Sequence, residues 1–271
     1  MTQTGTVSTP DAVEISGLVA SRSYQGGLWI HNDSGDSARV FGLNSSGAMH
    51  TQLELDGIEA IDFEDIAMGI NAYGEPTIVL ADIGDNASKR SQIVLYQFDE
   101  PVWNTSGPTQ RITNVSAYAL TYPDGAHDAE ALMYDPITDV FVIVTKSLSG
   151  ESHIYSIRRS QLGLQNVLEK KGTLFVGTPP LIGGTTVTGG DVGPNGHYIA
   201  LRTYTHIFVW KREESTPIWT TMQGDPCVVT PELEPQGEAL GFAAYGTDLF
   251  SISEGQNQPV YKYSTYTTKP D

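Results

Sequence analysis

The sequence predicts an all-β protein in which a four-stranded unit is repeated around a closed ring. Three observations predict this class. Short runs of β-branched and aromatic residues are bounded by Gly, Asn, Asp and Pro, and helical periodicity is nearly absent. A small, acidic segment recurs five times ahead of paired strands. The last repeat is complete only if the N-terminal residues supply its fourth strand.

Each repeat opens with a short segment that we expect to be the first strand of its unit. These segments are ISGLVAS, FEDIAMG, AEALMYD, GGDVGPN and GEALGFA. We anchor them on Ser16, Glu64, Glu130, Gly190 and Glu238, which are 48, 66, 60 and 48 residues apart. A second anchor in the next strand, at Asn32, Asp82, Lys146, Arg202 and Glu254, follows the first by 16, 18, 16, 12 and 16 residues. The interval between the two anchors is similar in each repeat, which indicates one repeating unit.

The remaining strands follow in order along each repeat. Second and third strands are expected at residues 28–31, 39–43, 77–81, 93–98, 140–145, 153–157, 198–202, 207–210, 249–253 and 260–263. Fourth strands are expected within residues 51–55, 112–120, 172–176 and 217–221. Residues 100–108, rich in Pro, Asn, Ser and Gly, are expected to be a surface loop within the second unit.

Only three strands follow Glu238, and the first fifteen residues can supply the fourth. This closure is typical of a β-propeller, in which blades of four strands surround a channel and the chain ends share a blade. The repeats predict a five-bladed propeller in one domain over residues 1–271. Six blades are the alternative, because two of the intervals are long.

Composition restricts the partners. The chain has 15 Lys and Arg against 32 Asp and Glu, a net charge of −17, and no run of 18 apolar residues. Such a surface repels nucleic acid and anionic lipid and favours cations, so we expect a small-molecule substrate rather than nucleic acid or a membrane. A closed propeller has few free strand edges, which favours a monomer. The N-terminus lacks signal-peptide features, and we favour a secreted or periplasmic location after signal removal.

Acidic residues recur where the inner strands begin. Because the inner strands of all blades line one channel, their carboxylates should converge, and converging carboxylates favour a bound cation or retained protons. Hard oxygen ligands of this kind suit Ca²⁺. The expected metal ligands are Asn32, Glu64, Asp82, Glu130, Asp191 and Glu238. Lys146, Arg202 and Glu254 should share the channel, with the two cations neutralising one side of it. The competing interpretation is that these acids only satisfy backbone N–H groups at strand ends.

The candidates for nucleophile or general base are His31, Asp33 and His127, because they lie beside the acidic positions. Two acidic loops, from Asn32 and from Asp82, resemble half of a calcium loop but lack the spacing of an EF-hand. The single cysteine, Cys227, excludes an internal disulfide and a cysteine-based zinc site. No G-x-S-x-G, P-loop, G-x-G-x-x-G or H-E-x-x-H motif occurs.

The segments SGLVAS, HNDSG, FEDIA, DIGDN, DAEAL, TGGDVGPNG and QGEALGF resemble those of bacterial β-propeller proteins of the phytase-like and esterase-like group. More distantly, the chain is similar to the gluconolactonase, paraoxonase and diisopropylfluorophosphatase propellers. The resemblance implies a Ca²⁺ in the central channel, held by Glu, Asn and Asp side chains, that polarises a lactone carbonyl or phosphoryl oxygen. Those relatives have six blades, whereas the repeats here number five.

Three functions follow as hypotheses. The first is a Ca²⁺-dependent hydrolase of lactones, aryl esters or phosphotriesters. The second is a non-enzymatic binding propeller with a structural ion, because a fold does not decide a function. The third is a glycoside hydrolase that uses paired channel carboxylates.

Overall fold

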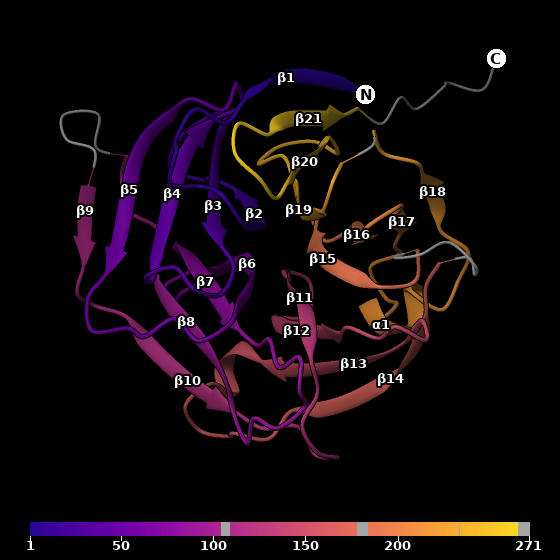
Figure 1. Cartoon of the computed structure of the whole chain (residues 1–271). Helices are drawn as coiled ribbons and strands as arrows, with labels where there is room; N and C mark the ends of the chain where they lie inside the picture. The colour runs from indigo at the N-terminus through magenta and orange to yellow at the C-terminus, as the bar shows by residue number, and fades with distance from the viewer. Residues whose placement is uncertain (104–108, 178–183, 233, 265–271) are drawn as a thin grey trace.

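The chain forms a five-bladed β-propeller around a central channel (Figure 1). A computed structural model covers the chain and describes residues 1–103, 109–177, 184–232 and 234–264. Within these ranges no helix is both long enough and apolar enough to cross a membrane. The predicted fold class and blade number are confirmed, and the six-bladed alternative is wrong.

Each blade contains four antiparallel strands, and the first strand in chain order, or β19 in the last blade, lies nearest the channel. Blade one contains β2 (Ile15–Ala20), β3 (Gly27–Asn32), β4 (Arg39–Asn44) and β5 (Met49–Leu55). Blade two contains β6 (Phe63–Ile70), β7 (Pro76–Asp82), β8 (Ile93–Asp99) and β10 (Ser116–Leu120). Blade three contains β11 (Ala129–Asp135), β12 (Val140–Thr145), β13 (Glu151–Arg158) and β14 (Glu169–Phe175). Blade four contains β15 (Val187–Val192), β16 (Tyr198–Thr203), β17 (Ile207–Lys211) and β18 (Cys227–Val229).

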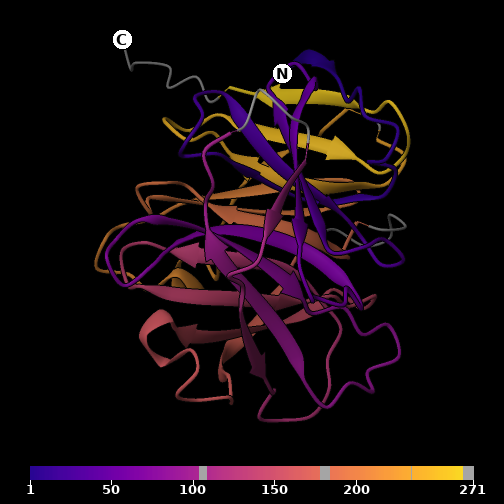
Figure 2. The same cartoon turned by 90° about the vertical axis from the view of Figure 1, so that its left-hand side faces the viewer.

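Blade five closes the ring with both ends of the chain. It contains β19 (Gly237–Phe242), β20 (Leu249–Ser253), β21 (Pro259–Tyr263) and the N-terminal strand β1 (Thr2–Thr6). The indigo strand β1 lies against the yellow strand β21 in both views (Figure 1, Figure 2) and pairs with it in antiparallel register. The predicted closure by the N-terminal segment is therefore confirmed.

Two outer strands differ from the prediction. The segment expected to be the fourth strand of blade four begins at Pro217 and instead forms the short helix α1 (Ile218–Thr221), and β18 takes the outer position. Proline lacks the N–H that a sheet ladder needs but is accommodated where a helix begins. Residues 112–120 are not one strand, because β9 (Thr109–Ile112) pairs in parallel with β5 and extends blade one. Part of the expected loop at 100–108, residues 104–108, lies outside the described residues.

The core is divided among the five junctions between blades. The buried hydrophobic residues that the structure describes form five clusters, and each cluster joins two neighbouring sheets. Trp29 of blade one, for example, packs with Phe63 and Leu80 of blade two. This distribution explains why inner strands such as β2, β11 and β15 are buried over their whole length.

Two buried carboxylates fasten the inner strands to one another. Asp65 of β6 accepts hydrogen bonds from the backbone N–H of Leu132 at 2.8 Å and of Gly190 at 3.3 Å, and so joins blades two, three and four. Asp191 of β15 accepts from the N–H of Phe242 in blade five at 2.8 Å. These bonds fix the inner strands around the axis and, with them, the side chains at their ends.

Candidate metal centre

Each inner strand has a β-bulge at its first residues. Pairing with the second strand skips one residue in every blade, and the skipped residues are Ser16, Glu64, Glu130, Thr188 and Glu238. A bulge redirects a side chain out of the normal alternation of a strand. Five redirected side chains therefore lie at equivalent positions around the axis, and three of them are glutamates.

Carboxylates from three blades meet beside these bulges. Asp33, Asp62 and Glu64 form one group, and Glu64, Asp128 and Glu130 form a second. Within each group the three residues offer oxygens that all lie within 4.8 Å of one another. Asp33 follows β3, Asp62 precedes β6 and Asp128 precedes β11. We name these five residues the acidic cluster, and Glu64 belongs to both of its groups.

Hydrogen bonds from the second strands hold the loops that carry the cluster. Asp82, at the end of β7, accepts from the N–H of Asp62 at 3.2 Å and forms an ion pair with Arg90 at 2.7 Å. Asn32 occupies the equivalent position in β3, and its Oδ1 accepts from the N–H of Val13 at 3.1 Å and of Glu14 at 3.2 Å. Both side chains thus position the loop ahead of the inner strand.

Gly84 leaves open the space into which the cluster projects. A Cβ atom at this residue would lie 2.2 Å from Glu64 Oε1 and 2.5 Å from the carboxylate of Asp62. Any larger residue would have to displace these carboxylates. The absence of a side chain at Gly84, in the loop DIGDN, therefore allows the carboxylates of Glu64 and Asp62 to lie against the backbone of this loop.

Burial makes the charged forms of these acids costly. It raises the pKa of Asp62 to about 6, aided by the charges of Asp33 and Asp128. Burial likewise raises the pKa of Glu64, with Glu130 as its strongest charged neighbour, and the pKa of Glu130 itself. Acids in this situation either retain protons or share a cation.

One ammonium contacts the acidic cluster within the described residues. Lys146 Nζ donates to Glu130 Oε1 at 2.5 Å. Burial alone would lower the pKa of Lys146, but the charge and hydrogen bond of Glu130 raise it. Glu130 Oε2 is buried and has no hydrogen-bond partner within residues 1–103, 109–177, 184–232 and 234–264. The cluster therefore has more negative charge than Lys146 can neutralise and a buried oxygen without a partner.

Glu238 extends the acidic region toward blade five. The Tyr204 hydroxyl donates to Glu238 Oε1 at 3.1 Å, whereas Oε2 is buried and has no hydrogen-bond partner in the described part of the chain. Burial raises the pKa of Glu238 to about 9, aided by a hydrogen bond and the charge of Glu254 and by the charge of Glu130. Lys146 Nζ lies 5.9 Å from the Tyr204 ring centre, between the acids of blades three and five.

Several predicted site residues lie elsewhere. The carboxylate of Asp191 is engaged by the N–H groups of Val192 and Phe242. Arg202 does not share the channel with Lys146, because its guanidinium is buried against Glu234 at 2.7 Å and the carbonyl of Ala239. The repeat alignment of blade four is wrong by two residues in its first strand, where the bulge falls at Thr188 rather than Gly190. Asn32 and Asp82 hold the loops described above and belong to neither carboxylate group, although Asp82 Oδ2 is buried without a partner in the described part of the chain.

Of the three acid–base candidates, Asp33 alone belongs to the acidic cluster. His31 is fully buried against Phe63, its Nδ1 is 2.9 Å from the carbonyl of Asn32, and burial lowers its pKa to about 4. His127 Nε2 lies 3.1 Å from Asp124 and 2.8 Å from the Tyr155 hydroxyl, outside the cluster.

Sequence reasoning missed Asp62 and Asp128. Each stands two residues before an anchor glutamate, so both belong to a D-x-E pattern, DFE and DAE, at the start of an inner strand. Blade one has E-x-S, blade four T-x-T and blade five Q-x-E at the same place. This two-residue spacing is the signal that could have found them.

The geometry defines a β-propeller with an acidic cluster at one end of its channel. No protein-family model and no curated protein sequence matches the chain. Among solved structures, hydrazine synthase of Kuenenia stuttgartiensis matches with a TM-score of 0.50 and 9% identity over 95% of this chain and 97% of that chain. A structure described as the Dos1 propeller has a TM-score of 0.41 and 11% identity, over 93% of this chain and 60% of that one. At such identities the likeness to hydrazine synthase concerns the fold alone.

Proposed function

We propose that the chain is a hydrolase that depends on a divalent cation, Ca²⁺, bound by the acidic cluster, and that it acts on lactones, aryl esters or phosphotriesters at this end of the channel. The observation that carries the proposal is the pair of carboxylate groups that share Glu64. The five members of the acidic cluster offer carboxylate oxygens, which are hard donors. In proteins Ca²⁺ is bound by six to eight oxygens from carboxylates, carbonyls and water.

The chemistry of the donors fits such a cation. Glu64 belongs to both groups. Lys146 pairs with one oxygen of Glu130, and the other oxygen is buried without a partner among the described residues. An unpaired buried carboxylate oxygen is costly, so a ligand that reaches it stabilises the folded state. A bound cation would supply Lewis-acid polarisation of a C=O or P=O oxygen.

The chain's own residues would then divide the remaining work. Lys146 can place a positive charge beside an oxygen that becomes negative during acyl or phosphoryl transfer. Asp33 lies at the partly exposed side of the cluster, and burial raises its pKa, which favours a role as general base. Glu238, whose pKa is also raised, can hold a proton near neutral pH and release it to a leaving group.

A non-enzymatic binding propeller is the second candidate, because Lys146 already neutralises part of the cluster. An ion in that case would be structural. The two candidates differ in whether a cation leaves a position open to substrate, and only the first predicts hydrolysis that stops on chelation.

Unfolding of the metal-free protein with Ca²⁺, Mg²⁺ or Zn²⁺ added back tests the site. The decisive variant is Glu64→Gln, since it removes the shared ligand charge, and Glu213→Gln is the matched control at an exposed position. Ca²⁺ should stabilise the wild type and the control by about 2.7 kcal/mol at one hundred times Kd and should have little effect on Glu64→Gln. If no cation stabilises the wild type, the metal site is refuted.

A panel of a lactone, an aryl acetate, an aryl phosphotriester and an aryl glycoside then tests the reaction. We expect hydrolysis of one of the first three, lost with chelator and restored by Ca²⁺. Ca²⁺ binding without any hydrolysis would favour the binding propeller. Cleavage of the glycoside that is insensitive to chelator would instead favour a glycosidase.

A further inference from the structure

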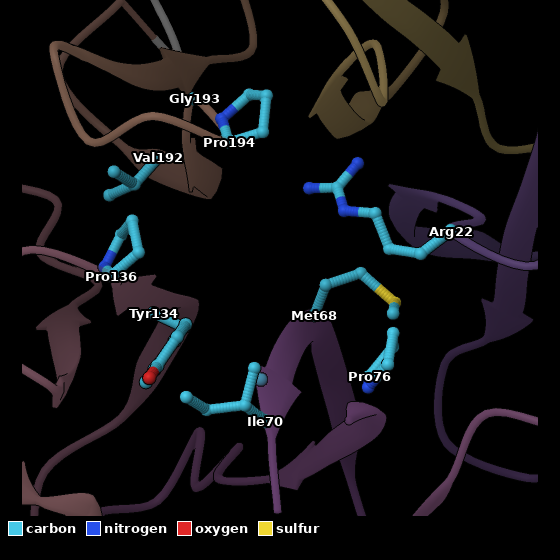
Figure 3. Close-up of a pocket in the computed structure, with 10 residues that line it drawn as sticks. Arg22, Met68, Ile70, Pro76, Tyr134, Pro136, Val192, Gly193 and Pro194 are labelled. Carbon is cyan, nitrogen blue, oxygen red and sulfur yellow. The ribbon is translucent and has the colours of Figure 1, made fainter. Parts of the chain in front are cut away.

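A pocket at the opposite end of the inner strands places an arginine against apolar walls (Figure 3). Its volume is about 240 Å³, and its wall includes Met68, Tyr134 and Val192, near the ends of β6, β11 and β15. All three side chains are nearly completely buried. Pro76 and Pro136 are exposed and mark the rim. The pocket is therefore built where the inner strands of three blades converge.

Arg22, in the turn after β2, supplies the charge in this pocket. Figure 3 shows its guanidinium pointing from blade one toward the space between Met68 and Pro194. The nitrogen Nη1 is buried and has no hydrogen-bond partner among the residues that the structure describes. Burial lowers the pKa of Arg22, and the charges of Asp191 and Glu100 oppose that effect.

Neither neighbouring carboxylate forms an ion pair with Arg22 in the described part of the chain. Both oxygens of Asp191 are already engaged by backbone N–H groups, those of Val192 and Phe242. Glu100 accepts from Ser21, from the Arg22 and Ser23 backbone and from Trp29, but not from the Arg22 guanidinium. Among the described residues, no carboxylate is thus paired with the Arg22 guanidinium.

A buried guanidinium nitrogen without a partner is unfavourable, and a planar carboxylate is the anion whose geometry matches it best. The Tyr134 hydroxyl is turned away, because it donates to Asp139 at 2.8 Å. The wall therefore offers ring and aliphatic surface to the rest of a ligand. A dry cavity of about 150 Å³ accepts benzene, so 240 Å³ suits one ring or a branched chain with its carboxylate.

We propose that this pocket binds a small monocarboxylate with an apolar body, whose carboxylate pairs with Arg22 and whose body packs on Met68, Tyr134 and Val192. The site is separate from the acidic cluster and does not depend on the proposed function. Benzoate is the probe that combines the required charge and size, and benzamide is its neutral counterpart of nearly the same shape.

Calorimetric titration of the whole chain with benzoate, in the presence of chelator, tests the proposal. Benzoate should bind one site in the wild type at least tenfold more tightly than benzamide. Arg22→Gln should lower the affinity for benzoate at least tenfold. Arg111→Gln removes an exposed arginine and should leave the affinity for benzoate unchanged. Failure of benzoate to bind at about 10 mM, or equal binding of benzoate and benzamide, would overturn the proposal.

A variant that fills the pocket gives an independent test should Arg22→Gln fold poorly. Ile70 lines the pocket and is half-buried, so Ile70→Phe reduces its volume while leaving Arg22 in place. Benzoate should bind this variant at least tenfold more weakly. Unchanged benzoate affinity in Ile70→Phe would place the ligand elsewhere and overturn the proposal.

Discussion

Glu100, directly after β8 of blade two, is hydrogen-bonded to the turn between β2 and β3 of blade one, and its removal should lower the free energy of unfolding. Its carboxylate accepts from Trp29 Nε1 at 2.8 Å, from Ser21 Oγ at 2.6 Å and from the N–H groups of Arg22 and Ser23 at 3.1 Å. In Glu100→Ala, the Trp29 N–H becomes a buried donor without a partner, which costs about 1–3 kcal/mol. Ser21 can turn to the nearby Ser23 hydroxyl, and the two backbone groups can reach water, so they add about 1 kcal/mol.

The expected loss of unfolding free energy is therefore about 2–4 kcal/mol for Glu100→Ala. Glu100→Gln keeps one acceptor oxygen for Trp29 but turns an amide donor toward the N–H of Ser23, and about 1 kcal/mol should be lost. Urea denaturation at pH 7 measures both, with Glu213→Gln as an exposed control expected to remain within about 0.5 kcal/mol of the wild type. A loss below 1 kcal/mol in Glu100→Ala would refute the role assigned to these hydrogen bonds.

Three further perturbations test the acidic cluster and the ring. Gly84→Ala should lower the affinity for Ca²⁺ at least tenfold, because the added Cβ would displace the carboxylates of Glu64 and Asp62. A calorimetric titration measures this affinity, and an unchanged value would contradict the expectation. Asp62 binds its proton more tightly in the folded state than in the unfolded state, because its pKa is raised to about 6. Without metal, its ionisation therefore lowers the free energy of unfolding as the pH rises from about 4 through about 6. Asp62→Asn should match the wild type near pH 4 and be more stable at pH 7 in denaturation with chelator, and equal pH slopes would argue against the raised pKa. Deletion of residues 1–6 removes β1 from β21 and should lower the free energy of unfolding by about 2 kcal/mol or more and promote self-association, measured by denaturation and light scattering. Unchanged stability and an unchanged mass in light scattering would show that closure is dispensable.

The blade pattern could be predicted because it is local in the sequence. The bulge residues Ser16, Glu64, Glu130 and Glu238 coincide with the anchors of four repeats. At each of these points a small or acidic residue precedes a short apolar strand, since the strand must be buried between two neighbouring blades. The closure could also be predicted, because a missing outer strand leaves an edge that the N-terminus is long enough to cover.

Blade four could not be aligned correctly, because its inner strand lacks the acidic signal. The equivalent of D-x-E is T-x-T there, at Thr186 and Thr188, and the nearest acid is Asp191, farther along the same strand. A shift of one residue in a strand turns a side chain to the opposite face. In blade four, Thr203 occupies the position equivalent to Asn32. Arg202 stands one residue earlier, so its side chain points toward blade five and pairs with Glu234.

The two ends of the channel have opposite chemistry, and this difference could not be read from the repeats, because Arg22 lies outside both anchor positions. Ile70 stands six positions after Glu64 in β6, so the acidic cluster and the pocket that contains Arg22 are about 20 Å apart. At that distance two unit charges interact by about 0.2 kcal/mol in water and by about 0.8 kcal/mol at an effective dielectric constant of about 20, so a divalent cation would change carboxylate binding by no more than about twentyfold. Benzoate titrations with chelator and with saturating Ca²⁺ should therefore give the same Kd within that factor. A larger difference would mean that the inner strands, joined through Asp65 and Asp191, transmit a structural change from one end of the channel to the other.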